Sequence, residues 1–247
     1  MTPRPLLPWR SVLLLAAAVA AAIPLTAVWL TDDDPALLVL APSSLAPIEG
    51  ELTVAMAAAG IGPVEWVFAG SQSLVAQVAD GVPADVVLVA DRRSLDAVIG
   101  VDPTLDGDIV FATNRLVLAV APTNPGDVDA LDDLADPDRL IGVCAVQVPC
   151  GRLAAVALDD LGLTVSADTE ETSARALTAK IATGELDAGL VYRTDARSAA
   201  LDVVVDEDLD RFVNTYHGVG TPVGTPVLDF LAGDGAARIL TEAGFGR

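Results

Sequence analysis

The sequence has few of the residues from which most enzyme sites are built. Its 247 residues include one histidine, His217, and two cysteines, Cys144 and Cys150. This supply cannot form a zinc cluster of histidines and cysteines or a covalent haem attachment. No serine and acid are placed near the histidine as a hydrolytic triad would need. We therefore expect no catalytic residues, no resident metal ion and no cofactor.

Basic residues are also scarce. Lysine and arginine number 14 against 35 aspartates and glutamates, which gives a formal net charge of −21. A chain this acidic is not expected to hold a nucleic-acid backbone, because such binding depends on basic side chains that displace counterions. Hydrophobic residues make up 52% of the sequence, enough for a sizeable core. The length allows one large domain or two lobes of about 100 residues each.

The N-terminal segment has the pattern of a targeting signal. Arg4 and Arg10 are its only charges before Asp32, and a largely apolar run extends over 11–30. A helix of that length would cover about 30 Å, the hydrocarbon thickness of a bilayer. We predict that residues 1–34 are a signal peptide or an N-terminal membrane anchor, so that the rest is exported and either membrane-tethered or secreted. The segment has no cysteine for a lipid anchor.

Export bears on how the two cysteines are interpreted. In an oxidising compartment Cys144 and Cys150, six residues apart, can form a disulfide that fixes a local loop. The alternative is a redox-active pair in an exported thiol-redox protein. The spacing is not Cys-x-x-Cys, and the first basic neighbour is Arg152, so the pattern favours a structural bond.

The remaining chain alternates strand and helix patterns. Short apolar runs rich in valine and leucine predict buried strands at 37–41, 85–90, 115–121 and 188–192. Helical spacing of apolar residues follows Ser71, Cys150 and Ser173, and a glycine closes each of these stretches. Such repeated strand and helix units predict an α/β architecture with helices covering mixed sheets.

Small or hydroxylated residues follow several of the predicted strands and begin the next helices. They occur at 42–45, 69–73, 148–151 and 173–175. Any one of them can be an ordinary helix N-cap. Helix N-termini also present free N–H groups and partial positive charge, and ligands of α/β folds bind beyond the carboxyl ends of strands. If these turns converge, they form a neutral cage of donors for an anion.

Several short sequence motifs then indicate a resemblance to a known protein family. They are APSSL (41–45), FAGSQSL (68–74), GVPADV (81–86), FATNRLVL (111–118), VPCG (148–151), GELDAGLVYRTDA (184–196) and the closing GF (244–245). In this order and spacing, across 37–247, the sequence resembles the periplasmic molybdate-binding proteins of ABC importers. The resemblance implies a type II periplasmic-binding-protein fold, with two α/β lobes joined by two crossing strands. Lobe 1 would comprise 35–113 and the return segment 214–247, and lobe 2 would comprise 114–213.

The same resemblance assigns ligand-binding residues. Ser44 and Ser71 of lobe 1 would donate from their hydroxyls and backbone N–H groups. Lobe 2 would supply the backbone N–H groups of Cys150 and Ala174 and the hydroxyl of Tyr192. A tetrahedral oxyanion offers only acceptors, so a set consisting only of donors suits it. Cys150 stands where the family commonly has alanine, and the change is tolerable because the expected contact is a backbone N–H.

The resemblance also implies the function. The protein would bind molybdate and also tungstate, act as a monomer, and deliver the ion to a membrane ABC permease without bond chemistry. Another tetrahedral oxyanion such as sulfate, or the thiol-redox role, is the alternative. The region 214–226 is shorter than the family leads one to expect, which leaves the edge of lobe 1 open. His217 is expected to be a surface or hinge residue rather than a base.

Overall fold

The structure is a computed structural model that describes residues 35–247. The predicted signal peptide or anchor, 1–34, lies outside the described residues. The strands are β1 (Leu37–Pro42), β2 (Val64–Ala69), β3 (Val86–Val89), β4 (Asp106–Val120), β5 (Ile141–Cys144), β6 (Ala167–Glu171), β7 (Ala188–Tyr192), β8 (Asp202–Val204) and β9 (Val213–Gly220).

Helices connect most of these strands. The α-helices are α1 (Glu49–Ala58), α2 (Ser71–Ala79), α3 (Arg92–Val101), α4 (Pro149–Leu161), α5 (Ala174–Ala182), α6 (Arg193–Ser198), α7 (Thr225–Ala232) and α8 (Asp234–Glu242). Three short 3₁₀ helices are η1 (Ser43–Ile48), η2 (Leu131–Ala135) and η3 (Glu207–Arg211). None of the helices formed by residues 35–247 has the length and apolar character needed to span a bilayer.

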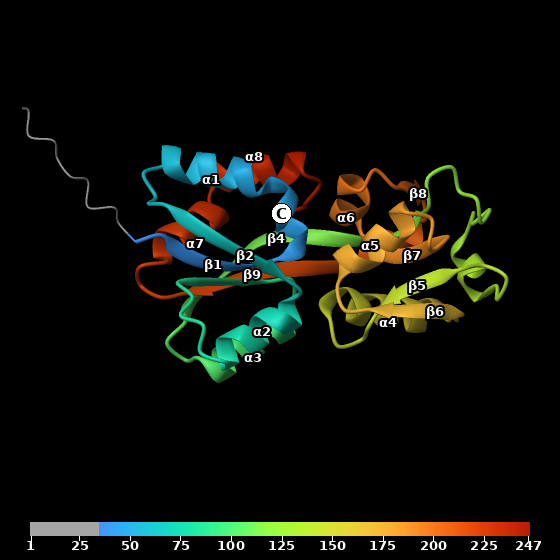
Figure 1. The fold of residues 1–247 in the computed structure, drawn as a ribbon, viewed down its shortest axis with the longest axis horizontal. Helices are drawn as coiled ribbons and strands as arrows, with labels where there is room; N and C mark the ends of the chain where they lie inside the picture. Colours follow the sequence, from blue (N-terminus) through green and yellow to red (C-terminus); the bar gives the residue numbers. More distant parts are fainter. Residues whose placement is uncertain (1–34) are drawn as a thin grey trace, which may run out of the picture. The chain divides into compact units, whose positions relative to one another are not determined.

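The strands form two groups that meet at two long strands. In the first group β1 lies between the parallel strands β2 and β3, and β3 pairs antiparallel with β9. In the second group β5 lies between the parallel strands β6 and β7, and β7 pairs antiparallel with β4. Strands β4 and β9 pair antiparallel and run from one group toward the other (Figure 1). The predicted mixed α/β fold with helices beside mixed sheets is therefore confirmed.

Helices cover both faces of the first group. Val39 of β1 packs into a cluster that includes side chains of α1, α7 and α8. The next residue, Leu40, packs into a separate cluster with side chains of α2 and α3. Neither Val39 nor Leu40 is exposed to solvent. Because successive side chains of a strand point to opposite faces, an uninterrupted apolar run is required wherever both faces are buried.

The second group follows the same rule along β4. Val117 and Ala119 pack in the cluster that contains residues of α5 and α6. Leu116 and Leu118 pack on the other face, against residues of α4 and η3. This alternation explains why the apolar run at 115–121 predicted a strand. The strand is longer than predicted and begins at Asp106. The sequence did not indicate this first part, because it is largely exposed and has no continuous apolar run.

The other predicted strands and the three predicted helices are present with similar bounds. In α4, Ala154 and Ala157 are buried while Leu153 and Leu161 are only partly buried. Gly162 ends this helix with φ +67, a left-handed conformation that glycine adopts without a steric penalty. The region 214–226 completes β9, turns, and enters α7.

Candidate functional site

A small cavity of about 30 Å³ lies where several strand-to-helix turns meet. It is lined by Pro42, Ser43, Ser44, Ala69, Gly70, Ser71, Ala90, Val148, Pro149, Cys150, Ser173, Ala174 and Tyr192. The structure thus brings together all five residues that the sequence singled out, Ser44, Ser71, Cys150, Ala174 and Tyr192. None of the lining residues is charged, so the donors that line the cavity are backbone N–H groups and hydroxyls.

Three α-helices begin at the cavity, and in each of them the first backbone N–H group has no side-chain cap. The N-caps of α2 and α4, Gly70 and Val148, provide no side-chain cap. Ser173 caps α5 by accepting from the Ala176 amide, which leaves the Ala174 amide available. The first N–H groups of a helix have no partner within it, and they carry partial positive charge. The cavity therefore receives unpaired backbone donors from three helices.

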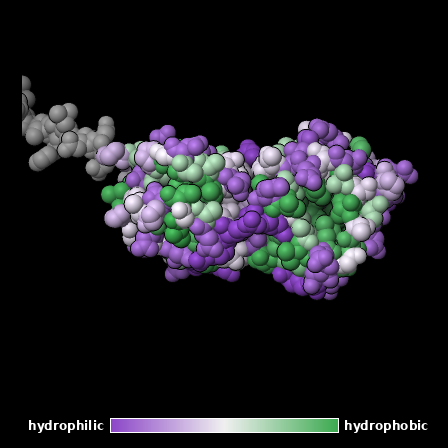
Figure 2. Space-filling view, turned by 90° about the horizontal axis from the view of Figure 1, so that it is seen from below, coloured by the Kyte–Doolittle hydropathy of each residue, from purple (hydrophilic) through white to green (hydrophobic). Residues whose placement is uncertain are grey.

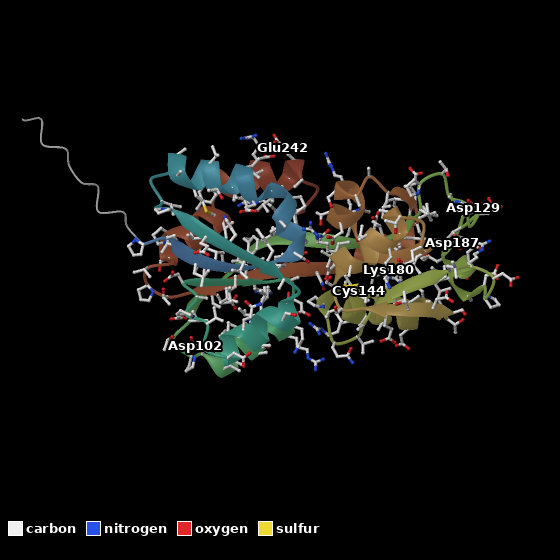
Figure 3. All side chains as sticks on the ribbon, viewed as in Figure 1. Asp102, Asp129, Cys144, Lys180, Asp187 and Glu242 are labelled. Atoms are coloured by element: carbon white, nitrogen blue, oxygen red, sulfur yellow. A yellow bond between two sulfur atoms is a disulfide. The ribbon has the colours of Figure 1, made fainter. Side chains whose placement is uncertain are left out.

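The start of α4 is shaped by its sequence. Pro149 occupies its first turn and has no N–H, so Cys150 supplies the first free amide of that helix. Cys150 is bonded to Cys144, which ends β5, and Figure 3 shows the position of Cys144. A Cβ at Gly151 would overlap the backbone carbonyl of Ala145, so this tight turn requires glycine. The disulfide closes this loop, and the glycine allows the tight turn that presents the Cys150 amide. The predicted disulfide is confirmed.

Each of the three hydroxyls that the sequence assigns to ligand binding has a partner that leaves a hydrogen for the cavity. Ser71 Oγ accepts from the Ala90 amide at 3.1 Å, so its own hydrogen is not used in that contact. Tyr192 Oη accepts from the Asn214 carboxamide, so the hydrogen of the Tyr192 hydroxyl is likewise not used in that contact. Both hydroxyl groups belong to buried residues. The protein thus orients these side chains as donors.

The third hydroxyl, Ser44, is oriented through a chain of contacts. Asn114 Nδ2 donates to Tyr216 Oη at 3.3 Å and to Thr194 Oγ1 at 2.7 Å. Tyr216 Oη lies 2.9 Å from Ser44 Oγ. Since Tyr216 accepts from Asn114, its hydrogen can go to Ser44, which in turn can donate into the cavity. Tyr216 is fully buried and does not line the cavity itself.

Burial keeps these phenols protonated. The pKa of Tyr192 is raised well above its ordinary value, mainly by desolvation and to a smaller extent by the neighbouring Tyr216. The pKa of Tyr216 is also raised, mainly by desolvation and to a smaller extent by the charge of Asp195. Both groups therefore remain neutral hydrogen-bond donors across the physiological pH range. Desolvation also raises the pKa of the buried Asp195 carboxyl, to about 7, and the charge of Arg175 opposes this shift.

Some residues of the site have no motif in the sequence. Asn114, Asn214 and Tyr216 orient the hydroxyls from β4 and β9, but single polar residues in strands do not predict which side chain they will reach. His217 is buried on β9 with Nδ1 3.1 Å from Asp108 Oδ1, so the surface half of the expectation of a surface or hinge residue is wrong, and the hinge half stays a prediction. Within 35–247, no three side chains of histidine, cysteine, aspartate or glutamate gather as a metal site.

Known proteins resemble this chain in sequence and in fold. The family model described as "Bacterial extracellular solute-binding protein" matches residues 37–246. The molybdate-binding protein ModA of Mycobacterium tuberculosis is 35% identical over 192 residues, which cover 74% of each chain. These two matches rest on sequence, and both cover most of the described chain.

Two solved structures share the fold. The periplasmic molybdate-binding protein of Azotobacter vinelandii has a TM-score of 0.66 and 20% identity, covering 85% of this chain and 99% of that one. The sulfate-binding protein SubI of Mycobacterium tuberculosis has a TM-score of 0.68 and 18% identity, covering 85% of this chain and 86% of that one. At these identities the likeness concerns the fold alone, and the two neighbours differ in the oxyanion they are named for.

Proposed function

The chain belongs to the bacterial extracellular solute-binding protein family, and from this we propose that it captures molybdate outside the cytoplasm and delivers it to a membrane ABC permease. Members of this family bind solutes and are not enzymes. Molybdate is then a ligand that is bound and released, rather than a cofactor. The sequence similarity to the mycobacterial ModA protein supports molybdate as the ion.

The observation that carries the proposal is the uncharged lining of the cavity, where backbone N–H groups and hydroxyls are the available donors. The free amides of Ser71, Cys150 and Ala174 begin three helices there. We propose that these amides and the hydroxyls of Ser44, Ser71 and Tyr192 hold the four oxygens of the ion. An oxyanion without a proton can accept from every donor, whereas a protonated anion would place its own hydrogen against one of them. Fully deprotonated tetrahedral dianions therefore fit best.

The neutral lining also explains how a protein with a net charge of −21 can bind a dianion. At physiological salt the Debye length is about 8 Å, so distant surface carboxylates are largely screened. The helix N-termini act within the cavity at hydrogen-bond distance, where water does not screen them. Tungstate, a near match in size, is the second ligand that we propose.

We further propose that the two strand groups act as lobes that close on the ion. Lobe 1 would be 35–113 with 214–247, and lobe 2 would be 114–213, with β4 and β9 as the connecting strands. The cavity is lined from both lobes, so the full donor set exists only when they are together. The permease would then recognise the closed form. In this proposal the protein acts as a monomer, and 1–34 exports or tethers it.

Sulfate is the second candidate, favoured by the fold likeness to a sulfate-binding protein. It is also a tetrahedral dianion, and it is smaller than molybdate. Cavity size, rather than the type of donor, would therefore separate the two ions. The thiol-redox alternative has less support, because both cysteines of the chain are joined in one disulfide and the family binds solutes.

Thermal unfolding in the presence of single oxyanions tests the proposal. A ligand at 100 times its dissociation constant stabilises the folded state by about 2.7 kcal/mol. For a chain of this size the melting temperature should rise by roughly 5–10 °C. We expect this rise with molybdate and tungstate, and little or none with sulfate and phosphate at the same concentration. A rise with sulfate alone would favour the second candidate, and no rise with any oxyanion would refute both.

A further inference from the structure

One ion pair connects the two strand groups beside the cavity. Arg152, in the first turns of α4, donates from Nε to Asp91 Oδ2 at 2.8 Å, and its Nη2 contacts the same oxygen. Nη2 also donates to Ser94 Oγ at 3.2 Å. Asp91 is the N-cap of α3 and accepts from the Ser94 amide through its other oxygen at 2.8 Å. The guanidinium therefore binds an acceptor that α3 already holds in place.

This ion pair differs from the others formed by residues 35–247. Each of the others joins two residues of 35–113 and 214–247, or two residues of 114–213. The Arg152 and Asp91 side chains are 19% and 14% exposed, whereas both side chains of the Arg92–Asp96 pair are 60% exposed. Charges withdrawn from water are less screened by salt, and removing one partner of such a pair leaves the other uncompensated.

The pair lies next to the walls of the cavity. Asp91 follows Ala90, and Arg152 stands two residues after Cys150, and both of these neighbours line the cavity. A motion that parts Ala90 from Cys150 would therefore also break the ion pair. Figure 2 views the molecule from the side of α2, α3 and α4, and hydrophilic side chains gather across the middle of this face.

We propose that Arg152 is a positioning residue that latches the closed form by holding Asp91, and so slows the release of the bound oxyanion. This inference rests on the proposed function. Release requires the cavity walls to part, so its rate includes the breaking of the latch. Capture begins from the open form, in which the latch is not made, so its rate does not depend on it. The affinity change on breaking the latch should therefore come from dissociation.

The test is the rate at which radiolabelled molybdate leaves the protein when chased with excess unlabelled molybdate. Two variants remove the charge pair with little change in shape: Arg152→Gln, and Asp91→Asn, which keeps a side chain able to cap α3. We expect each to raise the release rate by about tenfold or more and to change the capture rate by less than about twofold. The double variant should release no faster than about the faster single variant, because both changes break the same contact.

Arg92→Gln is the matched control. It removes a neighbouring arginine whose ion pairs, to Asp96 and Asp108, both lie within the first strand group. Its release rate should equal that of the wild type. The melting temperature of the ligand-free protein separates a latch from a purely structural role, because a latch made only on closure leaves it unchanged.

Three outcomes would contradict the proposals, and they can be told apart. If the wild type binds molybdate and both variants release it at the wild-type rate, the latch is refuted while the proposed function stands. If both variants only lower the ligand-free melting temperature, the ion pair is structural and the latch is likewise refuted. If the wild type binds no oxyanion, the proposed function is refuted and the latch with it.

Discussion

The side-chain oxygen of Ser71 accepts a hydrogen bond from the backbone N–H of Ala90 at 3.1 Å. Ala90 directly follows β3, and Ser71 is the first residue of α2. The contact therefore joins two strand-to-helix connections of the same strand group. It fixes the serine rotamer and leaves the hydroxyl hydrogen free for the cavity. Both residues line that cavity.

Ser71→Ala should weaken molybdate binding by about 10- to 100-fold, because a hydrogen bond to a charged group contributes about 1.5–3 kcal/mol. The dissociation constant from equilibrium dialysis measures this effect. Ser73→Ala, an exposed serine two residues further along α2, should bind as the wild type does. Equal affinities for the two variants would show that Ser71 does not donate to the ion.

Tyr216→Phe should weaken binding although Tyr216 does not touch the cavity. The change removes the hydroxyl that links the Asn114 carboxamide to Ser44, so the serine hydrogen is no longer directed inward. We expect a loss of roughly 3- to 10-fold, the range of one neutral hydrogen bond. Circular dichroism should confirm that the variant is folded. Unchanged affinity in a folded variant would mean that Ser44 is oriented without this contact.

Replacing both Cys144 and Cys150 by alanine should separate stability from binding. The disulfide closes a loop with a sequence separation of 6. Closing so short a loop stabilises by about 2 kcal/mol through chain entropy, which urea denaturation can measure. Affinity should stay within about threefold, since Cys150 contributes a backbone N–H that alanine retains. A loss of affinity beyond about tenfold in a folded variant would show that the bond itself shapes the site.

The buried carboxyl of Asp195 should make stability depend on pH. Burial raises its pKa in the folded protein to about 7, whereas an unfolded aspartate has a pKa of about 3.9. Between these values the folded state holds a proton that the unfolded chain has released, so stability falls as the pH rises from about 4 to 7. From pH 5 to 8 the loss should be about 2–3 kcal/mol.

Asp195→Asn is the matched variant for this prediction. An amide does not ionise, so urea denaturation should show a smaller loss of stability between pH 5 and 8. Glu171 does not interfere, because its hydrogen bond with Lys180 lowers its pKa and its contribution changes only at lower pH. The same slope in the variant and the wild type would assign the pH dependence to other groups.

The sequence allowed the buried strands and the turns of the site to be predicted. Runs such as that of β7 are apolar throughout because both faces are covered, and this pattern is visible without a structure. Ser44, Ser71, Cys150, Ala174 and Tyr192 were assigned by family resemblance, and the structure gathers them around one cavity. Their role as ligands of the ion remains a prediction. Local pattern alone could indicate donors at helix starts, but not that those starts converge.

Long-range polar contacts could not be predicted. Asp91 and Arg152 are 61 residues apart, and neither carries a local signal that distinguishes it from the other aspartates and arginines. Asn214 contacts Tyr192 of β7 and Tyr216 contacts Ser44 of η1, and only the register of β9 determines which side chains they reach. The exposed first part of β4 was missed because hydrophobic periodicity reports burial, and that part of the strand is largely exposed.

Calorimetric titration of the chain with molybdate, repeated with the Ser44→Ala/Ser71→Ala double variant, shows whether this cavity binds the ion. We expect one ion bound per chain, similar affinity for tungstate, binding of sulfate weaker by about 100-fold or more, and little measurable heat from the double variant. Molybdate binding that is undiminished in the double variant, or absent from the wild type, would contradict the claim that this cavity is an oxyanion site.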